Sequence, residues 1–186
     1  FWLNNPAFLN RARKKIFQLK LAKDLDFNIP PSLVTNQPDE MKSFYHKHGS
    51  GIIYKTMGGE FLDFGDKFFN IPTTLISESH LHQAELIRKS PSLFQGLIGK
   101  DYELRVTMVG DKLFPVKIYS QENELTMVDW RHPEVIQNLK YELVTLPNQI
   151  ERLCLEMMRH LGIVFGAFDL AVDRQGRYWF FEVNSN

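Results

Sequence analysis

The sequence predicts an α+β protein made of two lobes. Helical and strand patterns are mixed along the first half of the chain, and the second half ends in antiparallel hairpins, an order that is typical of α+β architectures. With 186 residues, of which 44% are hydrophobic and 13% aromatic, the chain can bury the core of one domain or of two lobes. We expect a hinge near Ser92 to Lys100, which gives lobes of residues 1–91 and 92–186.

The first predicted element is a single amphipathic helix from Asn10 to Asp26, because apolar residues recur there at helical spacing. Pro30 and Pro31 disfavour helix before them and end it. A short strand in "SLVTN" and a second helix over residues 38–46 follow.

The middle of the chain begins with "GIIYKT", residues 51–56, which we interpret as a buried strand that carries one lysine. Residues 57–70 are rich in Gly and Phe without a clear period, so a loop is expected, with a mobile start at Gly58 and Gly59. Ser77 and Glu78 then start a predicted short helix that runs to about Arg88.

The second half is predicted to be mostly strand. "LFQGLI" and "DYELRVTMV" are expected strands, and Gly110 with Asp111 turns the chain into "KLFPVKIYS". "GAFDLAVD" and "YWFFEVN" should pair across a four-residue turn, residues 174–177. A helix before this hairpin is indicated by an apolar stripe: Ile150, Leu153, Cys154, Met157 and Leu161.

Charge and composition exclude several classes of function. Lys plus Arg and Asp plus Glu both count 22, so no net field favours nucleic acid or an anionic membrane, and we expect neither as a partner. The single cysteine, Cys154, excludes an internal disulfide and suits a cytoplasmic protein. Because the first residues lack an initiating Met and a leader, we interpret the chain as a piece of a longer protein. A homodimer is an open alternative.

Two acids in the last hairpin suggest a metal site. In the expected register Asp169 faces Glu182, and Asn184 shares the same face because side chains alternate along a strand. Opposed like charges destabilise a sheet, so a buried pair needs a compensating cation, and oxygen ligands suit Mg²⁺. The alternative is that one acid faces solvent while the other pairs with an arginine such as Arg105; a one-residue slip would separate the acids.

Several basic residues are candidates for binding phosphate. Lys55 ends an apolar strand just before the glycines, where a phosphate would satisfy its charge; otherwise it reaches water. Glu103 and Arg105 share one face of their strand, as an acid that holds an arginine would, or as a plain surface pair would. Arg131 in "DWRHP" could point at a transferring phosphate or simply pair with Asp129.

Other motifs add little. His80 and His82 are two residues apart on a predicted helix, whereas residues that share a ligand would be three or four apart, so we interpret both as surface residues. The sequence contains no GxGxxG, no GxxxxGK[ST] and no GxSxG pattern. A nucleotide site of the dinucleotide-binding or phosphate-loop type is therefore not indicated.

The succession of segments resembles the ATP-grasp ligase superfamily, and within it the microviridin-type, or graspetide, ligases that modify ribosomally made peptides. The resemblance covers nearly the whole chain and rests on "KIFQLKLAKDLDFNIPPSLVTNQP", "GIIYKTM", "SLFQGLIGKDYELRVTMVGDKLF", "DWR" and "LGIVFGAFDLAVDRQGRYWFFEVN". It implies an ATP-grasp fold, in which two α+β lobes sandwich ATP, and an amino-terminal family domain outside this piece.

The resemblance also implies roles for individual residues. The residues expected to bind the nucleotide, through its phosphates or at the adenine hinge, are Lys15, Lys55, Gln95, Leu97, Ile98 and Glu103. The residues expected to act around the reacting phosphate are Arg105 and Arg131. The residues expected to hold magnesium are Asp169, Glu182 and Asn184.

The chemistry implied by the resemblance is activation of a carboxylate as an acyl phosphate by ATP, followed by attack of an amine or hydroxyl with release of ADP and phosphate. In graspetide ligases the carboxylate is a peptide Asp or Glu and the nucleophile is a Ser, Thr or Lys. We therefore expect an enzyme with ATP and Mg²⁺ as cofactors and a precursor peptide or other carboxylate substrate as partner. Two alternatives stay open: a ligase that adds amino acids to a protein or small-molecule carboxylate, and a module that binds ATP without chemistry.

Overall fold

The chain forms two units in this computed structural model, which describes residues 3–49, 51–57, 61–63, 65 and 68–185. One unit comprises Phe1–Ile29 with Gly99–Asn186, and the other comprises Pro30–Ile98. This division differs from lobes of residues 1–91 and 92–186. The second boundary falls inside the expected hinge, but the first 29 residues group with the carboxyl-terminal part of the chain.

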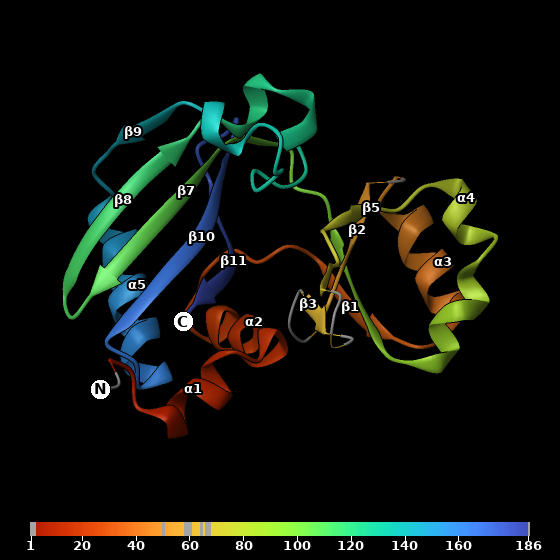
Figure 1. Cartoon of the computed structure of the whole chain (residues 1–186), viewed down its shortest axis with the longest axis horizontal. Helices are drawn as coiled ribbons and strands as arrows, with labels where there is room; N and C mark the ends of the chain where they lie inside the picture. The colour runs from red at the N-terminus through yellow and green to blue at the C-terminus, as the bar shows by residue number, and fades with distance from the viewer. Residues whose placement is uncertain (1–2, 50, 58–60, 64, 66–67, 186) are drawn as a thin grey trace. The chain divides into compact units, whose positions relative to one another are not determined.

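The larger unit is built on a five-stranded antiparallel sheet of order β11-β10-β7-β8-β9 (Figure 1). Its strands are β7 (Lys100–Val109), β8 (Lys112–Ile118), β9 (Tyr141–Leu143), β10 (Phe165–Asp173) and β11 (Tyr178–Asn184). Both predicted hairpins are present, and Gly110 takes a positive φ of 59° in the first turn. Between β8 and β9 the chain forms three short 3₁₀ helices, η2 (Ser120–Glu122), η3 (Glu124–Thr126) and η4 (Ile136–Asn138).

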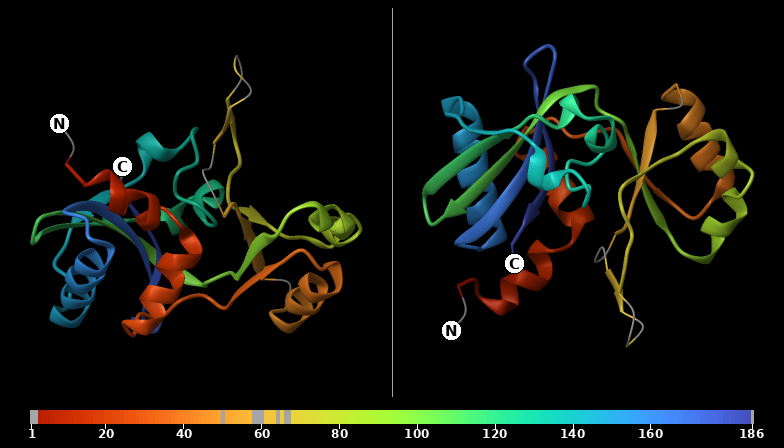
Figure 2. Two further views of the ribbon diagram at one scale, coloured as in Figure 1. Left: turned by 90° about the horizontal axis from the view of Figure 1, so that it is seen from below. Right: turned by 45° about the horizontal axis from the view of Figure 1, so that its top comes forward.

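Helix α5 (Asn148–Leu161) lies along one face of this sheet (Figure 2). The residues of the predicted apolar stripe are all buried: Ile150, Leu153, Cys154, Met157 and Leu161. The prediction of a core-packing helix is confirmed, and the thiol of Cys154 belongs to that core. Burial raises the pKa of this thiol to about 12, so it stays protonated at neutral pH.

Gly162 ends α5 in the left-handed region, with φ 71°, and a Cβ there would lie 2.9 Å from the Phe8 ring. We expect Gly162→Ala to lower the free energy of unfolding by roughly 1–2 kcal/mol, measured by urea titration. Gly176→Ala is the matched control, because Gly176 has a similar φ of 76° and a Cβ there would meet no described atom within 4 Å. Equal losses in the two variants would mean that the Phe8 ring simply moves aside.

Asp173 closes the turn between β10 and β11. Its carboxylate accepts hydrogen bonds from the backbone amides of Gln175 (2.9 Å) and Arg177 (3.0 Å). It also accepts from the Arg177 guanidinium (2.7 Å) and the Trp179 indole (2.9 Å). Burial raises the pKa of Asp173, but these donors outweigh burial and lower the pKa to about 2.

A depressed pKa makes the contribution of Asp173 to stability depend on pH. The contribution is present above the unfolded pKa, near 4, and is lost as the pH falls toward about 2. We expect Asp173→Asn to destabilise the chain at pH 7, with the difference from wild type shrinking between about pH 4 and pH 2. Urea unfolding over this pH range tests it, and a difference that stays constant with pH would contradict it.

The predicted single helix over residues 10–26 is wrong, because the chain forms two helices, α1 (Pro6–Ala12) and α2 (Lys15–Asp24). Lys14 takes an extended backbone, with φ −81° and ψ 105°, and the chain turns there. In an unbroken helix the Ala12 carbonyl would accept an amide of the next turn; here it accepts the side-chain amide of Gln18. A buried polar side chain thus replaces a helical hydrogen bond.

The amino-terminal segment covers the outer edge of β11, which explains why it groups with the larger unit. The Asn28 carbonyl accepts the backbone amide of Phe180 at 2.8 Å, beside an isolated parallel bridge. Gln18 bonds the backbone of Val183, and Asn4 bonds the backbone at the end of β11. Side chains and backbone of one segment therefore satisfy an edge that would otherwise be exposed.

The smaller unit has a four-stranded antiparallel sheet of order β1-β6-β2-β5. The strands of this sheet and the helices of the unit, in chain order, are β1 (Ser32–Thr35), α3 (Pro38–Lys47), β2 (Ile52–Lys55), β5 (Thr74–Leu75), α4 (Glu78–Leu81), η1 (Ala84–Lys89) and β6 (Ser92–Gly96). The helices share a buried core with the strands: Met41, Tyr45, Ile52, Ile76, Ala84 and Phe94. The predicted strands 51–56 and "LFQGLI" and the helix over 38–46 are confirmed, and the helix expected from Ser77 to Arg88 is split into α4 and η1.

The expected loop over residues 57–70 contains two paired strands, β3 (Phe61–Asp63) and β4 (Phe68–Asn70). The loop prediction is wrong for these residues, because strands of three residues are too short to show a two-residue period. Gly58 and Gly59, expected to start a mobile segment, lie outside the described residues. His80 and His82 are exposed as expected, and the His80 ring accepts the Ser77 amide at 3.0 Å.

Within the described part of the chain, no helix combines the length and the apolar character needed to cross a membrane.

Candidate functional site

The candidate site is centred on two buried acids. Asp169 on β10 and Glu182 on β11 are Cα partners, with 3% and 5% of their surfaces exposed. The predicted register is therefore confirmed where it brings the acids together, and the alternative of a solvent-facing acid is wrong. Beyond this pair the register shifts by one residue, since Leu170 pairs with Phe180. Such bulges change the direction in which neighbouring side chains point.

Asn184 lies on the same face as the two acids, as predicted. Its amide nitrogen donates to Asp169 Oδ2 at 2.9 Å and to Glu182 Oε1 at 3.3 Å. Turning the amide over would direct its oxygen toward the same point, so the side chain can serve either a carboxylate or a cation. No group of three His, Cys, Asp or Glu side chains suited to a metal occurs among the residues that the structure describes. A cation here would thus be held by two carboxylates and one amide oxygen, a set that suits Mg²⁺.

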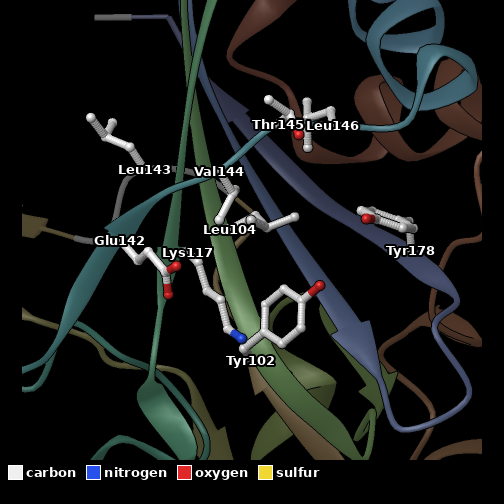
Figure 3. A pocket seen from close by; sticks show the side chains of 9 residues that line it. All are labelled: Tyr102, Leu104, Lys117, Glu142, Leu143, Val144, Thr145, Leu146 and Tyr178. Atoms are coloured by element: carbon white, nitrogen blue, oxygen red, sulfur yellow. The ribbon is translucent and has the colours of Figure 1, made fainter.

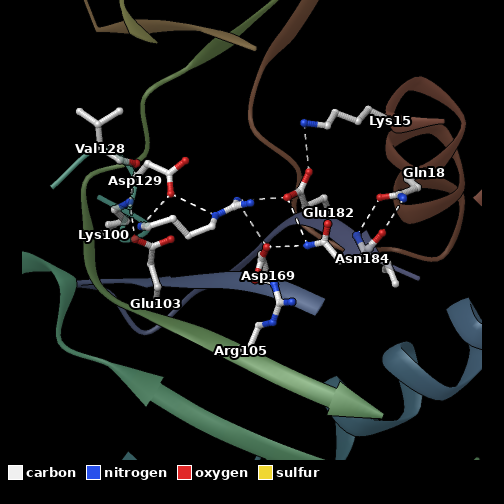
Figure 4. A network of polar contacts seen from close by, with 12 residues as sticks. Lys15, Gln18, Lys100, Glu103, Arg105, Val128, Asp129, Asp169, Glu182 and Asn184 are labelled. Atoms are coloured by element: carbon white, nitrogen blue, oxygen red, sulfur yellow. Dashed lines mark hydrogen bonds and ion pairs between the residues drawn. The ribbon is translucent and has the colours of Figure 1, made fainter. Parts of the chain in front are cut away.

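Three cationic side chains contact the acids, each from a different part of the larger unit; Figure 4 labels two of them, Lys15 and Arg105. Arg105 Nη1 on β7 lies 2.7 Å from Asp169 Oδ1. Arg131 Nη2, from the connection between β8 and β9, lies 3.1 Å from Glu182 Oε1 and 3.5 Å from Asp169 Oδ2. Lys15 Nζ on α2 lies 3.2 Å from Glu182 Oε2. The structure therefore brings together six residues of the site expected from the sequence: Lys15, Arg105, Arg131, Asp169, Glu182 and Asn184.

Of the two interpretations of Arg131, the pairing with Asp129 is present in the structure. Its backbone amide and its Nε donate to Asp129 Oδ1 at 3.1 and 3.2 Å, so Asp129 is its partner. The same arginine reaches the two acids with Nη2. Asp129 therefore orients a guanidinium whose other end lies in the acid cluster. The expected contact of Arg131 with a phosphate stays a prediction.

The prediction that Glu103 holds Arg105 is wrong. Glu103 Oε1 accepts from Lys100 Nζ at 2.7 Å, and the same ammonium donates to the Val128 carbonyl at 2.9 Å. Arg105 is held by Asp169, its Cα partner on β10. Directly opposed residues on neighbouring strands are closer than residues two apart on one strand, which explains the preference. Burial raises the pKa of Glu103, and Lys100 opposes that rise.

Burial makes ionisation of Asp169 unfavourable even beside its cationic neighbours. Burial raises the pKa of Asp169 to about 6, Glu182 adds to the rise, and Arg105 and Arg131 oppose it. A cation bound between the carboxylates would favour their ionised forms. The donor set of two carboxylates and one amide oxygen fits a bound divalent metal.

The remaining residues expected at a nucleotide site lie in the smaller unit. Lys55 is the last residue of β2, and Gln95 is buried in β6, where its amide donates to Ser32 Oγ at 2.9 Å. The Leu97 amide donates to the Gly51 carbonyl at 2.8 Å. A contact of the Leu97 backbone with an adenine would therefore use its carbonyl oxygen.

A separate groove of about 610 Å³ lies on the five-stranded sheet (Figure 3), on the face opposite to the acid cluster. Tyr102, Lys117, Glu142 and Tyr178 line it, and the Lys117 ammonium lies 4.1 Å from the centre of the Tyr102 ring. Leu104, which also lines the groove, precedes Arg105 on β7, so the two side chains point to opposite faces. The groove is therefore separated from the acid cluster by the sheet itself.

No family model matches the chain, and no curated protein does. Solved structures do match. A RiPP-associated ATP-grasp ligase from Chryseobacterium gregarium, in complex with ADP and a leader and core peptide, is 31% identical with a TM-score of 0.88; the match covers 98% of this chain and 55% of that one. The macrocyclase MdnC of Microcystis aeruginosa MRC, bound with precursor peptide MdnA, is 32% identical with a TM-score of 0.83, over 98% of this chain and 56% of that one.

The ATP-grasp ligase PsnB, complexed with a phosphomimetic variant of its minimal precursor, Mg and ADP, is 21% identical with a TM-score of 0.74, which is a likeness of fold. The match covers 98% of this chain and 53% of PsnB. The chain thus spans about half the length of these relatives. The resemblance found in the sequence is confirmed: the chain has the fold of ATP-grasp ligases and is similar, over 98% of its length, to a RiPP-associated ligase and to a macrocyclase.

Proposed function

We propose that this chain is the nucleotide-binding part of an ATP-dependent ligase that joins a peptide side-chain carboxylate to a hydroxyl or amine of the same peptide. The observation that carries the proposal is the buried acid pair of Asp169 and Glu182 with Asn184 beside it, ringed by three cations from separate elements. Two carboxylates and an amide oxygen are ligands that suit a divalent metal, and three cations beside two acids leave positive charge for a polyanion.

Different residues of the chain would bind the metal and the phosphates. Asp169, Glu182 and Asn184 would hold Mg²⁺, while Lys15 and Lys55 would contact phosphate oxygens. ATP and Mg²⁺ together supply the phosphoryl group that activates the substrate carboxylate and the charge that stabilises its transfer. No other cofactor is needed for this chemistry.

Arg105 and Arg131 would act on charge that develops during transfer. Each is already oriented by an acid, Arg105 by Asp169 and Arg131 by Asp129, so little reorganisation is required when a phosphate arrives. Fixed guanidinium groups neutralise anionic oxygens with charge-assisted hydrogen bonds. The expected contribution of these arginines is therefore to transition-state stabilisation more than to nucleotide affinity.

The similarity to ligases solved with a leader and core peptide, and with a precursor peptide, favours a peptide over a free amino acid as substrate. The test is an assay of ADP release by the full-length protein, with ATP and Mg²⁺, against short peptides that carry acidic residues beside Thr, Ser or Lys. Peptide-dependent ADP release, with loss of one water per bond from the peptide mass, supports the proposal. ADP release that requires free amino acids instead would favour the amino-acid ligase, and nucleotide binding without turnover would favour a non-catalytic module.

A further inference from the structure

Gln18 on α2 holds the backbone of the strand that carries two of the expected metal ligands. Its side chain is buried, with 2% of the residue exposed. Its oxygen accepts the Val183 amide at 2.8 Å, and its nitrogen donates to the Val183 carbonyl at 2.8 Å (Figure 4). One side chain thus reproduces the double hydrogen bond that an antiparallel neighbouring strand would make on the outer edge of β11.

We call the two hydrogen bonds from Gln18 to Val183 the clamp. Its effect follows from the position of Val183 between Glu182 and Asn184. The Val183 amide belongs to the peptide plane that leaves Glu182, and the Val183 carbonyl belongs to the plane that enters Asn184. Because peptide groups are planar, fixing both planes sets the direction of the Cβ atoms on either side. Glu182 and Asn184 both point to the site, since side chains alternate along a strand.

The pairing of β10 with β11 is irregular on one side of Glu182. The register shifts between Asp169 and Leu170, whereas Val183, on the other side of Glu182, pairs in register with Phe168. Glu182 therefore lies between a bulge and the backbone that Gln18 holds. A third hydrogen bond, from Gln18 to the Ala12 carbonyl, holds the clamp itself in place.

The same helix couples the clamp to the acid cluster. Lys15 lies one turn before Gln18 on α2 and contacts Glu182 at 3.2 Å. We propose that Gln18 is a positioning residue, which sets the orientation of Glu182 and Asn184 for metal binding from the edge of the sheet. The inference rests on the proposed function, because it assigns its effect to the same metal site.

The experiment measures Mg²⁺ affinity by calorimetry at a saturating concentration of a non-hydrolysable ATP analogue, in the full-length protein and in Gln18→Leu. We expect Gln18→Leu to weaken Mg²⁺ binding by roughly 10- to 100-fold, the range for residues that orient metal ligands. Affinity for the analogue without Mg²⁺ should change by less than about threefold, because the phosphate-contacting lysines and the hinge are untouched. Amide exchange of Val183 in the metal-free protein should accelerate, which reports on the clamp without any ligand.

A second variant keeps the test informative if Gln18→Leu fails to fold. Gln18→Glu retains the acceptor for the Val183 amide and loses the donor to the Val183 carbonyl, so its Mg²⁺ affinity should fall between those of wild type and Gln18→Leu. Ile150→Val on α5 is the matched control: it removes one buried methylene group from another element and should leave Mg²⁺ affinity unchanged.

The outcomes separate the two proposals. Wild-type Mg²⁺ affinity in folded Gln18 variants would overturn the positioning role while leaving the proposed function intact. An equal fall in the Ile150→Val control would also overturn it, since general destabilisation would then be the cause. Absence of Mg²⁺-dependent nucleotide binding in the wild-type protein would overturn the proposed function, and the positioning role with it.

Discussion

Replacing Asp169 with asparagine is expected to weaken magnesium-dependent nucleotide binding by at least roughly 100-fold, while the chain stays folded. Asp169 is buried, opposes Glu182 across the hairpin and receives a hydrogen bond from Asn184, so it is enclosed by the cluster. A neutral amide retains its shape but removes the charge that a divalent cation requires. Calorimetric titration with a non-hydrolysable ATP analogue, with and without Mg²⁺, measures the loss.

Two further variants control this prediction. Glu182→Gln should weaken magnesium-dependent binding more than it disturbs folding, and equal loss of both would contradict its metal role. Asp24→Asn removes an exposed carboxylate that pairs with Lys20 at 2.6 Å and should change nothing in the titration. Retention of magnesium-dependent binding in Asp169→Asn would show that the acids belong to the ion-pair network alone.

Asp169→Asn should weaken magnesium-dependent nucleotide binding without lowering the free energy of unfolding of the metal-free protein. Burial raises the pKa of Asp169 to about 6, so the ionised carboxylate destabilises the metal-free fold. The folded chain binds the extra proton between about pH 4 and pH 6, and stability therefore falls as the pH rises through that window. Asp169→Asn removes this loss, so the variant without metal should be at least as stable as wild type at neutral pH. An acid retained at a cost to stability is the pattern expected of a functional site.

The meeting of Asp169 and Glu182 could be predicted because it depends on two local features: the alternation of side chains along a strand and the short turn around Gly176. The bulge beside the pair could not, since the pairing of Leu170 with Phe180 is set by the packing of the folded sheet. The bulge leaves the acids opposed and shifts only the residues toward the turn. The predicted pairing of Asp169 with Glu182 is therefore correct, although the predicted register is wrong from Leu170 to the turn.

The residues missed by sequence analysis act over long separations. Gln18 and Asn4 bond backbone groups at the far end of the chain, and no local pattern reports such a contact. One signal was available for Gln18, because it lies three residues after Lys15 and so shares its helix face. The pairing of Lys100 with Glu103 could not be predicted, because a two-residue period places residues three apart on opposite faces; the register of β7 shifts at Lys100 in the folded sheet.

Replacing Asn4 with alanine is expected to lower the free energy of unfolding by roughly 2–4 kcal/mol, a large effect on stability for a residue outside the apolar core. The Asn4 oxygen accepts the amides of Val164 and Phe165, both at 2.9 Å. Its nitrogen donates to the carbonyls of Phe165 at 2.8 Å and Ser185 at 2.9 Å. Truncation would leave buried backbone groups unpaired at the start of β10 and the end of β11.

Asn5→Ala is the matched control for this loss. Asn5 is exposed and caps α1 by accepting the Ala7 amide at 2.9 Å, so its removal should cost about 1 kcal/mol. Asn4→Asp separates the two halves of the network, because the carboxylate keeps the acceptor for the amides and loses the donor to the carbonyls. Its stability in urea titration should fall between wild type and Asn4→Ala. Equal losses for Asn4→Ala and Asn5→Ala would contradict the prediction, because they would mean that the backbone bonds of Asn4 add nothing beyond the loss of a helix cap.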